Sequence, residues 1–175
     1  IDRDTIRLSG ARNLPELLRL VPGFQVGFRY GHTATVSYHG MSDELSRRLQ
    51  VLIDGRSIYE PSLARIQWLD LPIALENIQR IEVTRGPNSA LYGANSFNAV
   101  VNIISLSAKE VNGVEFSFKQ GEKNIHDRLL TAATNLGKQG DFRVSVGSRG
   151  DSGFDETRDG DPRYDSYLAN FANAR

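Results

Sequence analysis

The segment from residue 81 to residue 93 holds the densest group of residues that could do chemistry in this sequence. Its two glycines, Gly86 and Gly93, suggest a loop whose backbone N–H groups cradle a phosphate. The spacing does not fit a phosphate loop, because no Lys-Ser or Lys-Thr pair follows the second glycine and no G-x-G-x-x-G pattern is present. The pattern instead predicts a strand, a tight turn at Gly86-Pro87, one helical turn and a C-cap at Gly93.

Other residues that could hold a metal or catalyse hydrolysis lack the spacing that such chemistry requires. His32, His39 and His126 are the only histidines and lie far apart, so we expect no metal site. No G-x-S-x-G motif is present, and the carboxylates do not form an identifiable catalytic pair. We therefore expect no catalytic activity and no bound cofactor.

An acidic stretch near the end of the chain could in principle bind calcium. It does not follow the EF-hand pattern, and two arginines interrupt it. We therefore interpret it as a solvated loop; its members are Asp151, Asp155, Glu156, Asp159, Asp161 and Asp165.

Composition excludes several classes of protein. The 175 residues include 21 Lys and Arg, 21 Asp and Glu, and no cysteine. Without cysteine the chain cannot be a disulfide scaffold, hold a Cys-ligated zinc ion or use a thiol nucleophile. A net charge of zero argues against a general nucleic-acid binder, which needs basic residues to displace counterions. The longest uncharged stretch, residues 86–108, contains proline, glycine and asparagine, so it does not predict a membrane-spanning helix.

The first 110 residues alternate short helical and strand patterns. Asp2 or Asp4 can cap a helix that ends at Leu8, and Asn13 can cap a second helix over residues 14–21. Period-2 or β-branched runs predict short strands, and Asp54-Gly55 is a strong turn signal. We expect a small mixed sheet with short helices; its strands are predicted at residues 24–28, 35–39, 49–53, 79–84 and 99–104, with a short helix at 72–77.

After Lys109 the chain becomes a series of alternating segments, predicted at residues 113–119, 128–136, 142–147 and 166–173. This pattern predicts an antiparallel meander with one apolar face. The connection at 137–140 is short and the one at 149–165 is long, an alternation typical of outer-membrane barrels, although a soluble sandwich would also fit. The residues expected on the apolar face are Val114, Phe116, Phe118, Leu130, Ala132, Leu136, Phe142, Val144, Val146, Tyr167, Ala169 and Phe171.

Three motifs in a fixed order resemble the plug domain of TonB-dependent outer-membrane receptors. Residues 13–23 (NLPELLRLVPG) resemble the family's early helix, and residues 51–55 (VLIDG) its central hairpin. Residues 78–104, with RGP at 85–87, LYG at 91–93 and VNII at 101–104, resemble the end of the plug. One departure is that Asn98 and Ala99 stand where the family often has a glycine pair.

The resemblance implies an α+β fold in two parts. Residues 1–110 would form the mixed-sheet plug domain with its short helices. Residues 111–175 would be the first antiparallel strands of a transmembrane β-barrel of about 22 strands, of which the rest would follow Arg175. The TonB box, through which the family contacts TonB, would precede Ile1.

The resemblance also implies where ligand would bind. A plug presents hairpin apices to the outside, here the loops at residues 28–33 and 56–68. Arginine beside aromatic rings suits a bulky anionic chelate. The alternative for Phe28 and Trp68 is a place in the plug core. The predicted ligand contacts are Phe28, Arg29, Tyr30, His32, Arg56, Tyr59, Arg65 and Trp68.

Two further sets of residues take their roles from the resemblance. In the family, the arginine of the RGP motif pairs with glutamates of the barrel wall, so Arg85 and Glu82 are predicted to form a plug–barrel lock. The partner glutamates would lie beyond residue 175, and Arg85 is expected here to be solvated or locally paired. The turns are predicted at Gly55, Gly86, Pro87 and Gly93.

The resemblance implies transport rather than catalysis. The expected protein is a receptor in the outer membrane of a Gram-negative bacterium that imports a scarce nutrient with energy from TonB. A ferric siderophore is the leading cargo and cobalamin the second. The alternative from another class is a soluble periplasmic or extracellular ligand-binding module. Strands without their barrel neighbours leave open edges, so the chain is expected to self-associate or to be disordered after residue 112.

Overall fold

A computed structural model describes residues 1–41, 45–137, 140–157 and 159–175. The chain divides into two compact units. Unit 1 comprises residues 1–29, 33–69 and 75–105, and unit 2 comprises residues 30–32, 70–74 and 106–175. Within the described residues, no helix combines the length and apolar character needed to cross a membrane.

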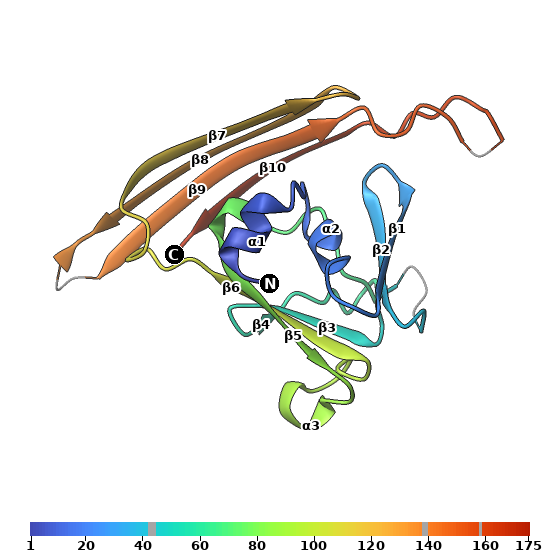
Figure 1. Ribbon diagram of the computed structural model, residues 1–175, viewed down its shortest axis with the longest axis horizontal. Helices are drawn as coiled ribbons and strands as arrows, with labels where there is room; N and C mark the ends of the chain where they lie inside the picture. Colours follow the sequence, from blue (N-terminus) through green and yellow to red (C-terminus); the bar gives the residue numbers. More distant parts are fainter. Residues whose placement is uncertain (42–44, 138–139, 158) are drawn as a thin grey trace. The chain divides into compact units, whose positions relative to one another are not determined.

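Unit 1 is organised around a four-stranded mixed sheet with the order β4-β3-β6-β5 (Figure 1). Strand β6 (Ala99–Ser105) is parallel to β3 (Leu49–Ile53) and antiparallel to β5 (Ile78–Arg85), while the short β4 (Arg56–Ser57) completes a hairpin with β3. Strand β6 is almost entirely buried, as its β-branched run predicts for a central strand. The predicted mixed sheet with short helices is confirmed.

A separate hairpin joins β1 (Phe24–Tyr30) to β2 (Thr33–Tyr38). Its base is closed by Phe24, whose ring lies 5.1 Å from that of Tyr38. Strand β1 runs two residues further than the alternation predicted, to Tyr30, so that the turn contains only Gly31 and His32.

The helices of unit 1 are short and their ends are set by polar caps. In α1 (Arg3–Leu8), Asp2 accepts from the Thr5 backbone N–H at 2.8 Å, and bonds from the Thr5 side chain and N–H lower the pKa of Asp2. In α2 (Leu14–Leu18), Asn13 accepts from the Glu16 N–H at 3.1 Å. The remaining helical turns are η1 (Leu75–Asn77) and α3 (Ser89–Tyr92).

Two helix predictions were too long. The second helix was expected to reach Val21, but α2 ends at Leu18 and tighter turns follow, in which Leu20 and Val21 bond to carbonyls three residues back. Such bonds are common where a helix tightens at its end, here just before Pro22-Gly23. The helix predicted at residues 72–77 is reduced to the single turn η1.

The turn at Asp54-Gly55 is fastened to the last residue of β6. Asp54 has a left-handed φ of 49°, a conformation that aspartate tolerates and most residues do not. Its carboxylate accepts from the Ser105 N–H at 2.9 Å and from the Ser105 hydroxyl at 2.8 Å. The β3–β4 turn therefore holds the chain where it leaves unit 1.

Most of unit 2 is an antiparallel meander of four long strands, which Figure 1 shows side by side. They are β7 (Gly113–Gly121), β8 (Ile125–Asn135), β9 (Asp141–Asp151) and β10 (Tyr167–Ala174). The predicted meander is confirmed; β7, β8 and β9 are longer than predicted, and β10 has the predicted length but begins one residue later. Part of the short connection predicted at 137–140 lies outside the described residues, whereas the β9–β10 connection is long.

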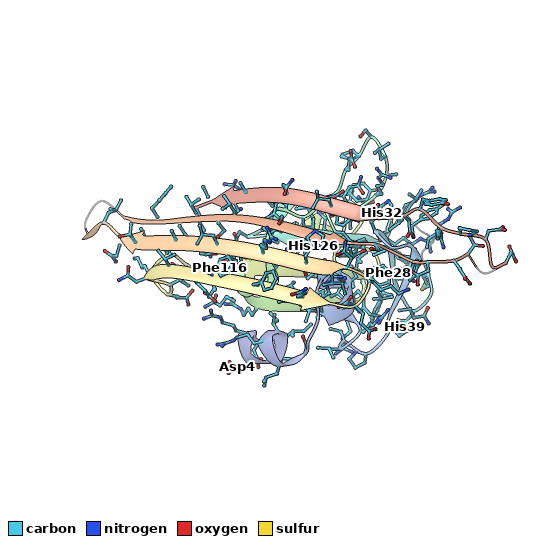
Figure 2. All side chains as sticks on the ribbon, turned by 90° about the horizontal axis from the view of Figure 1, so that it is seen from above. Asp4, Phe28, His32, His39, Phe116 and His126 are labelled. Atoms are coloured by element: carbon cyan, nitrogen blue, oxygen red, sulfur yellow. The ribbon has the colours of Figure 1, made fainter. Side chains whose placement is uncertain are left out.

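One face of this sheet is apolar and exposed. The register places Phe116 opposite Leu130, and Leu130 opposite Val146, in a row across three strands. Phe116 is 67 % exposed, and Figure 2 looks onto the face of this sheet, with Phe116 labelled. This face matches the prediction for β7, β8 and β9.

The prediction for β10 is wrong as to the face. Phe171 pairs with Gly147 and so lies on the opposite side of the sheet from Val146. The residue of β10 that joins the exposed apolar face is Leu168, which is 64 % exposed. Alternation shows which residues of a strand share a face, but only the register with a neighbour shows which face that is.

The opposite face of the sheet carries buried polar groups. The Thr131 hydroxyl donates to the Ser145 hydroxyl at 3.0 Å. Arg143 is only 1 % exposed and donates through Nη1 to the Leu106 carbonyl. Buried Arg143 and hydroxyl groups on one side, and the exposed phenylalanines of β7 on the other, make this a two-sided sheet.

We expect Asp54→Ala to destabilise unit 1 by about 1–3 kcal/mol, because the buried Ser105 loses its carboxylate acceptor and alanine disfavours a positive φ. The matched control is Asp54→Asn, which keeps one acceptor oxygen and tolerates the same φ. The measurement is urea unfolding of the chain in detergent, followed by the fluorescence of Trp68, the only tryptophan. Equal midpoints for the alanine variant and the wild type would contradict this role of Asp54.

Candidate functional site

Asp165 is the centre of the best-defined polar cluster in unit 2. Its side chain is buried, with 6 % of the residue exposed. It accepts from the backbone N–H of Gly31 at 2.8 Å and from that of Phe154 at 2.8 Å, and it lies 3.4 Å from the Arg163 guanidinium. One carboxylate therefore ties the tip of the β1–β2 hairpin to both ends of the β9–β10 loop.

Two glycines allow this close approach. A Cβ atom on Gly31 would lie 2.7 Å from the Gly153 Cα, and a Cβ atom on Gly153 would lie 2.0 Å from the Asp165 Oδ1. Gly153 also has a left-handed φ of 69°. Side chains at either position would force the hairpin tip away from the loop.

Aromatic rings and an arginine surround this carboxylate. The His32 ring stacks between Tyr30, at a centroid distance of 6.2 Å, and Tyr167, at 5.8 Å. The Arg163 guanidinium lies 4.7 Å from the Tyr30 ring centroid and 5.8 Å from that of Phe154. We call these six residues the tip cluster: Tyr30, His32, Phe154, Arg163, Asp165 and Tyr167.

The short segment 70–74 is fastened beside the tip cluster. The Tyr167 hydroxyl donates to Asp70 at 2.6 Å, and Arg149 donates through Nη2 to the Ile73 carbonyl at 2.8 Å. Arg149 also lies over the Phe171 ring, 4.7 Å from its centroid. Arg149 of β9 and Tyr167 of β10 therefore bind residues that are far away in the sequence.

Only two of the predicted ligand contacts belong to the tip cluster. Tyr30 is 37 % exposed, and His32 is labelled beside the end of the meander in Figure 2. Both can offer a ring face or edge to a ligand. The structure therefore gives Tyr30 and His32 neighbours that the sequence did not predict.

The other six predicted contacts lie in unit 1. Phe28 is half-buried, with the Arg19 guanidinium 5.9 Å from its ring centroid, and Arg65 pairs with Glu60 at 3.8 Å. Trp68 is 3 % exposed, which agrees with its alternative assignment to the core. Arg29 and Arg56 are exposed, and Tyr59 is half-buried.

Sequence reasoning missed four members of the tip cluster. Asp165 was interpreted as part of a solvated acidic loop, and this is wrong because Asp165 is buried and bonded to three segments. Its neighbours Arg163 and Tyr167 flank it at two-residue spacing, but that pattern is common in exposed loops. No local signal separates Asp165 from the exposed Asp161, because its main partner is 134 residues away.

The residues predicted to lock the plug lie on β5. Glu82 pairs with Arg80 at 2.7 Å, and Arg85 is exposed at the end of the strand. The predicted turn glycines Gly55, Gly86 and Gly93 have positive φ values of 78°, 92° and 75°. Pro87 follows the second of these directly, and proline is common in turns.

Comparison with known families and proteins adds independent findings. The family model for the TonB-dependent receptor plug domain matches residues 1–100. The vitamin B12 transporter BtuB of Vibrio cholerae is 28 % identical over 157 residues, which cover 88 % of this chain and 25 % of the relative. BtuB of Photobacterium profundum is 30 % identical over 155 residues, with the same coverage. The chain thus spans about a quarter of the length of these relatives.

A solved structure shows the same fold. The ferric yersiniabactin uptake receptor FyuA of Yersinia pestis superposes with a TM-score of 0.72 over 99 % of this chain and 27 % of its own, at 17 % identity. Such low identity supports the fold alone. It agrees with the arrangement of a mixed sheet followed by meander strands.

We expect Asp165→Ala to release the hairpin tip. The Gly31 N–H then loses a bond to a charged acceptor, which is worth about 1.5–3 kcal/mol, so its hydrogen exchange should accelerate roughly 10- to 100-fold. The control is Asp161→Ala, which removes an exposed carboxylate from the same loop. Amide exchange followed by mass spectrometry or NMR makes the comparison, and an unchanged rate at Gly31 in Asp165→Ala would contradict the assignment.

Proposed function

The chain belongs to the TonB-dependent receptor plug domain family, and on this premise we propose that the full-length protein imports a scarce nutrient across the outer membrane of a Gram-negative bacterium. The family is one of receptors and transporters rather than enzymes. Energy for import would come from TonB, which would contact a segment upstream of the plug.

The exposed apolar face of the meander supports a place in the membrane. Phe116 and Leu168 are 67 % and 64 % exposed on this face, while the opposite face carries Arg143 and hydroxyl groups. In water such a face would be costly, whereas lipid would cover it. We infer that this face contacts acyl chains and that the polar face lines the barrel interior.

The tip cluster supports a bulky metal chelate as the cargo. Tyr30 offers an exposed ring, and the Arg163 guanidinium beside it can attract an anionic ligand. A ferric siderophore fits this chemistry, and cobalamin, the cargo named for the BtuB relatives, is the second candidate. Arg56 and Tyr59 on unit 1 remain proposed ligand contacts in their own right.

Unit 1 is suited to act as the gate of the barrel. Its strands are short, and β4 contains only two residues. Elements of this size open locally at a small cost in free energy. Ligand bound outside would rearrange the plug, and a pull by TonB from the periplasmic side would then open a path through the lumen.

Arg85 and Glu82 are proposed to lock this plug to the barrel wall. Arg85 is exposed at the end of β5, where a guanidinium can form a bidentate pair with wall carboxylates. Glu82 already holds Arg80 at 2.7 Å, which leaves Arg85 as the principal lock residue.

We expect Tyr30→Ala to weaken ligand binding by the full-length receptor about tenfold or more, because a stacking ring is lost. Tyr92→Ala is the matched control, since Tyr92 is also 37 % exposed but lies on α3, outside the tip cluster. Binding is measured by equilibrium dialysis with cyanocobalamin and with ferric catecholate, hydroxamate and phenolate siderophores. The ligand that binds identifies the cargo class.

Two outcomes would contradict the proposal. Equal losses of binding in both variants, or no loss in either, would contradict a ligand surface at Tyr30. Binding of none of these compounds would contradict the proposed import of a metal chelate.

We expect Arg85→Ala to loosen the plug in the full-length receptor. Loss of an ion pair in the partly dry lumen should lower the urea midpoint of plug unfolding and leave the barrel midpoint unchanged. The control is Arg56→Ala, which removes an exposed arginine from the same sheet. Hydrogen exchange of peptides from residues 1–110 at each urea concentration reports plug unfolding, and far-UV circular dichroism reports the barrel. Identical plug midpoints in Arg85→Ala and Arg56→Ala would exclude a lock at Arg85.

A further inference from the structure

A short row of polar side chains interrupts the exposed apolar face of the meander. The register places Arg128 of β8 opposite Phe118 of β7 on one side and opposite Ser148 of β9 on the other. Ser148 in turn lies opposite Asn170 of β10. Directly opposite residues share a face of the sheet, with Cβ atoms about 4.5–5.5 Å apart, so these polar side chains are neighbours. We call Arg128, Ser148 and Asn170 the polar row.

The polar row lies on the same face as the exposed apolar side chains. Arg128 stands two residues before Leu130, and Ser148 stands two residues after Val146. Residues two apart in a strand point to the same side of the sheet. Figure 2 looks onto this side and labels Phe116 and His126 on it. Apolar side chains therefore adjoin the row on the same strands.

Charge is divided unequally between the two faces. Among the side chains that β7 to β10 direct to the apolar face, Arg128 is the only arginine or lysine, and none is aspartate or glutamate. Arg128 is exposed, and within the described residues its side chain forms no hydrogen bond or ion pair. The acidic residues of these strands belong to the opposite face; they are Glu115, Asp127, Asp141 and Asp151.

The surroundings of Arg128 within the sheet are complete. Strand β8 pairs with β7 along one edge and with β9 along the other, and both register neighbours of Arg128 are described. Any further strand of the full-length protein must therefore pair elsewhere. A partner for the guanidinium has to approach from the side of the apolar face, where the proposed function places lipid.

The position of Arg128 along β8 indicates which leaflet this lipid belongs to. Arg128 lies in the half of β8 (Ile125–Asn135) that is nearer to the end of β9 at Asp151, where the long β9–β10 connection begins. Long connections lie on the outer side of outer-membrane barrels. A charged side chain among acyl chains is costly, so the long side chain of an arginine extends toward the headgroups. The outer leaflet therefore supplies the groups that Arg128 can reach.

We propose that the polar row binds a phosphate group of a glycolipid in the outer leaflet. The guanidinium of Arg128 can donate two parallel, charge-assisted hydrogen bonds to a phosphate. The Ser148 hydroxyl and the Asn170 amide can each donate one more. Acyl chains of the same lipid would lie against Leu130 and Val146. The site rests on the proposed function, because that function places this face in the outer membrane, but it does not depend on the cargo.

Lipid binding to the full-length receptor in detergent tests the polar row. The probes are bisphosphorylated lipid A, dephosphorylated lipid A and phosphatidylglycerol, and bound lipid is measured by native mass spectrometry. We expect Arg128→Gln to weaken binding of phosphorylated lipid A about tenfold or more, because charge-assisted hydrogen bonds are lost. Arg128→Lys should bind with intermediate affinity, because it keeps the charge without the bidentate fork.

The matched control is Lys119→Gln. It removes the same charge from the adjacent row of the sheet, but Lys119 lies opposite Asp127 and so belongs to the other face. Its affinity for phosphorylated lipid A should equal that of the wild type. The comparison of phosphorylated with dephosphorylated lipid A uses the wild-type receptor, so it does not require any variant to fold.

Several outcomes would overturn the proposal. These are an unchanged affinity in Arg128→Gln, an equal loss in Lys119→Gln, equal binding of dephosphorylated lipid A or phosphatidylglycerol, and displacement of lipid A by inorganic phosphate. A loss confined to the Arg128 variants, together with a preference for phosphorylated lipid A, supports it.

A second measurement separates this site from the proposed function. Phe116→Trp places a fluorescent ring on the apolar face, and lipids brominated along their acyl chains quench it on contact; Trp68, at 3 % exposure, provides the background in the wild type. Quenching together with unchanged lipid A binding in Arg128→Gln overturns the polar row alone. Absence of quenching overturns both the polar row and the membrane position of this face. Neither result depends on whether the receptor binds a metal chelate.

Discussion

The burial of strand β6 is the constraint on which unit 1 depends. Ala99, Val101 and Ile103 are fully buried, and β6 pairs along both edges, with β3 on one side and β5 on the other. Because it is central, the neighbouring strands must present their remaining edges outward. The Asp54 turn can then reach Ser105, and Ile1 and Asp2 pair with β5 on its outer edge.

Unit 2 has a different constraint, because the two faces of its sheet differ in polarity. The phenylalanines of β7 and the aliphatic side chains of β8 and β9 form one face, whereas Arg143, Thr131 and Ser145 belong to the other. Burial of an arginine requires partners for its donors, and one of these is the Leu106 carbonyl. A two-sided sheet of this kind suits a barrel wall between lipid and a polar interior.

In the tip cluster a single carboxylate organises the surface proposed to bind the ligand. Asp165 binds the backbone of Gly31 and Phe154 as well as Arg163, so three short segments without regular structure are held in one arrangement. Rings fixed in this way lose little entropy when a ligand stacks on them. The proposed ligand surface therefore depends on a buried residue, Asp165.

The sequence by itself determined the elements of this protein: the caps at Asp2 and Asn13, the buried run of β6, the Asp54-Gly55 turn and the four meander strands. These follow from local propensity and periodicity, which act over a few residues. The family resemblance likewise rests on local motifs. Only the tertiary structure decided which face of the meander the side chains of each strand occupy and which acidic residue is buried. Each of these depends on a partner tens of residues away, as between Gly31 and Asp165, and periodicity carries no information about such a partner.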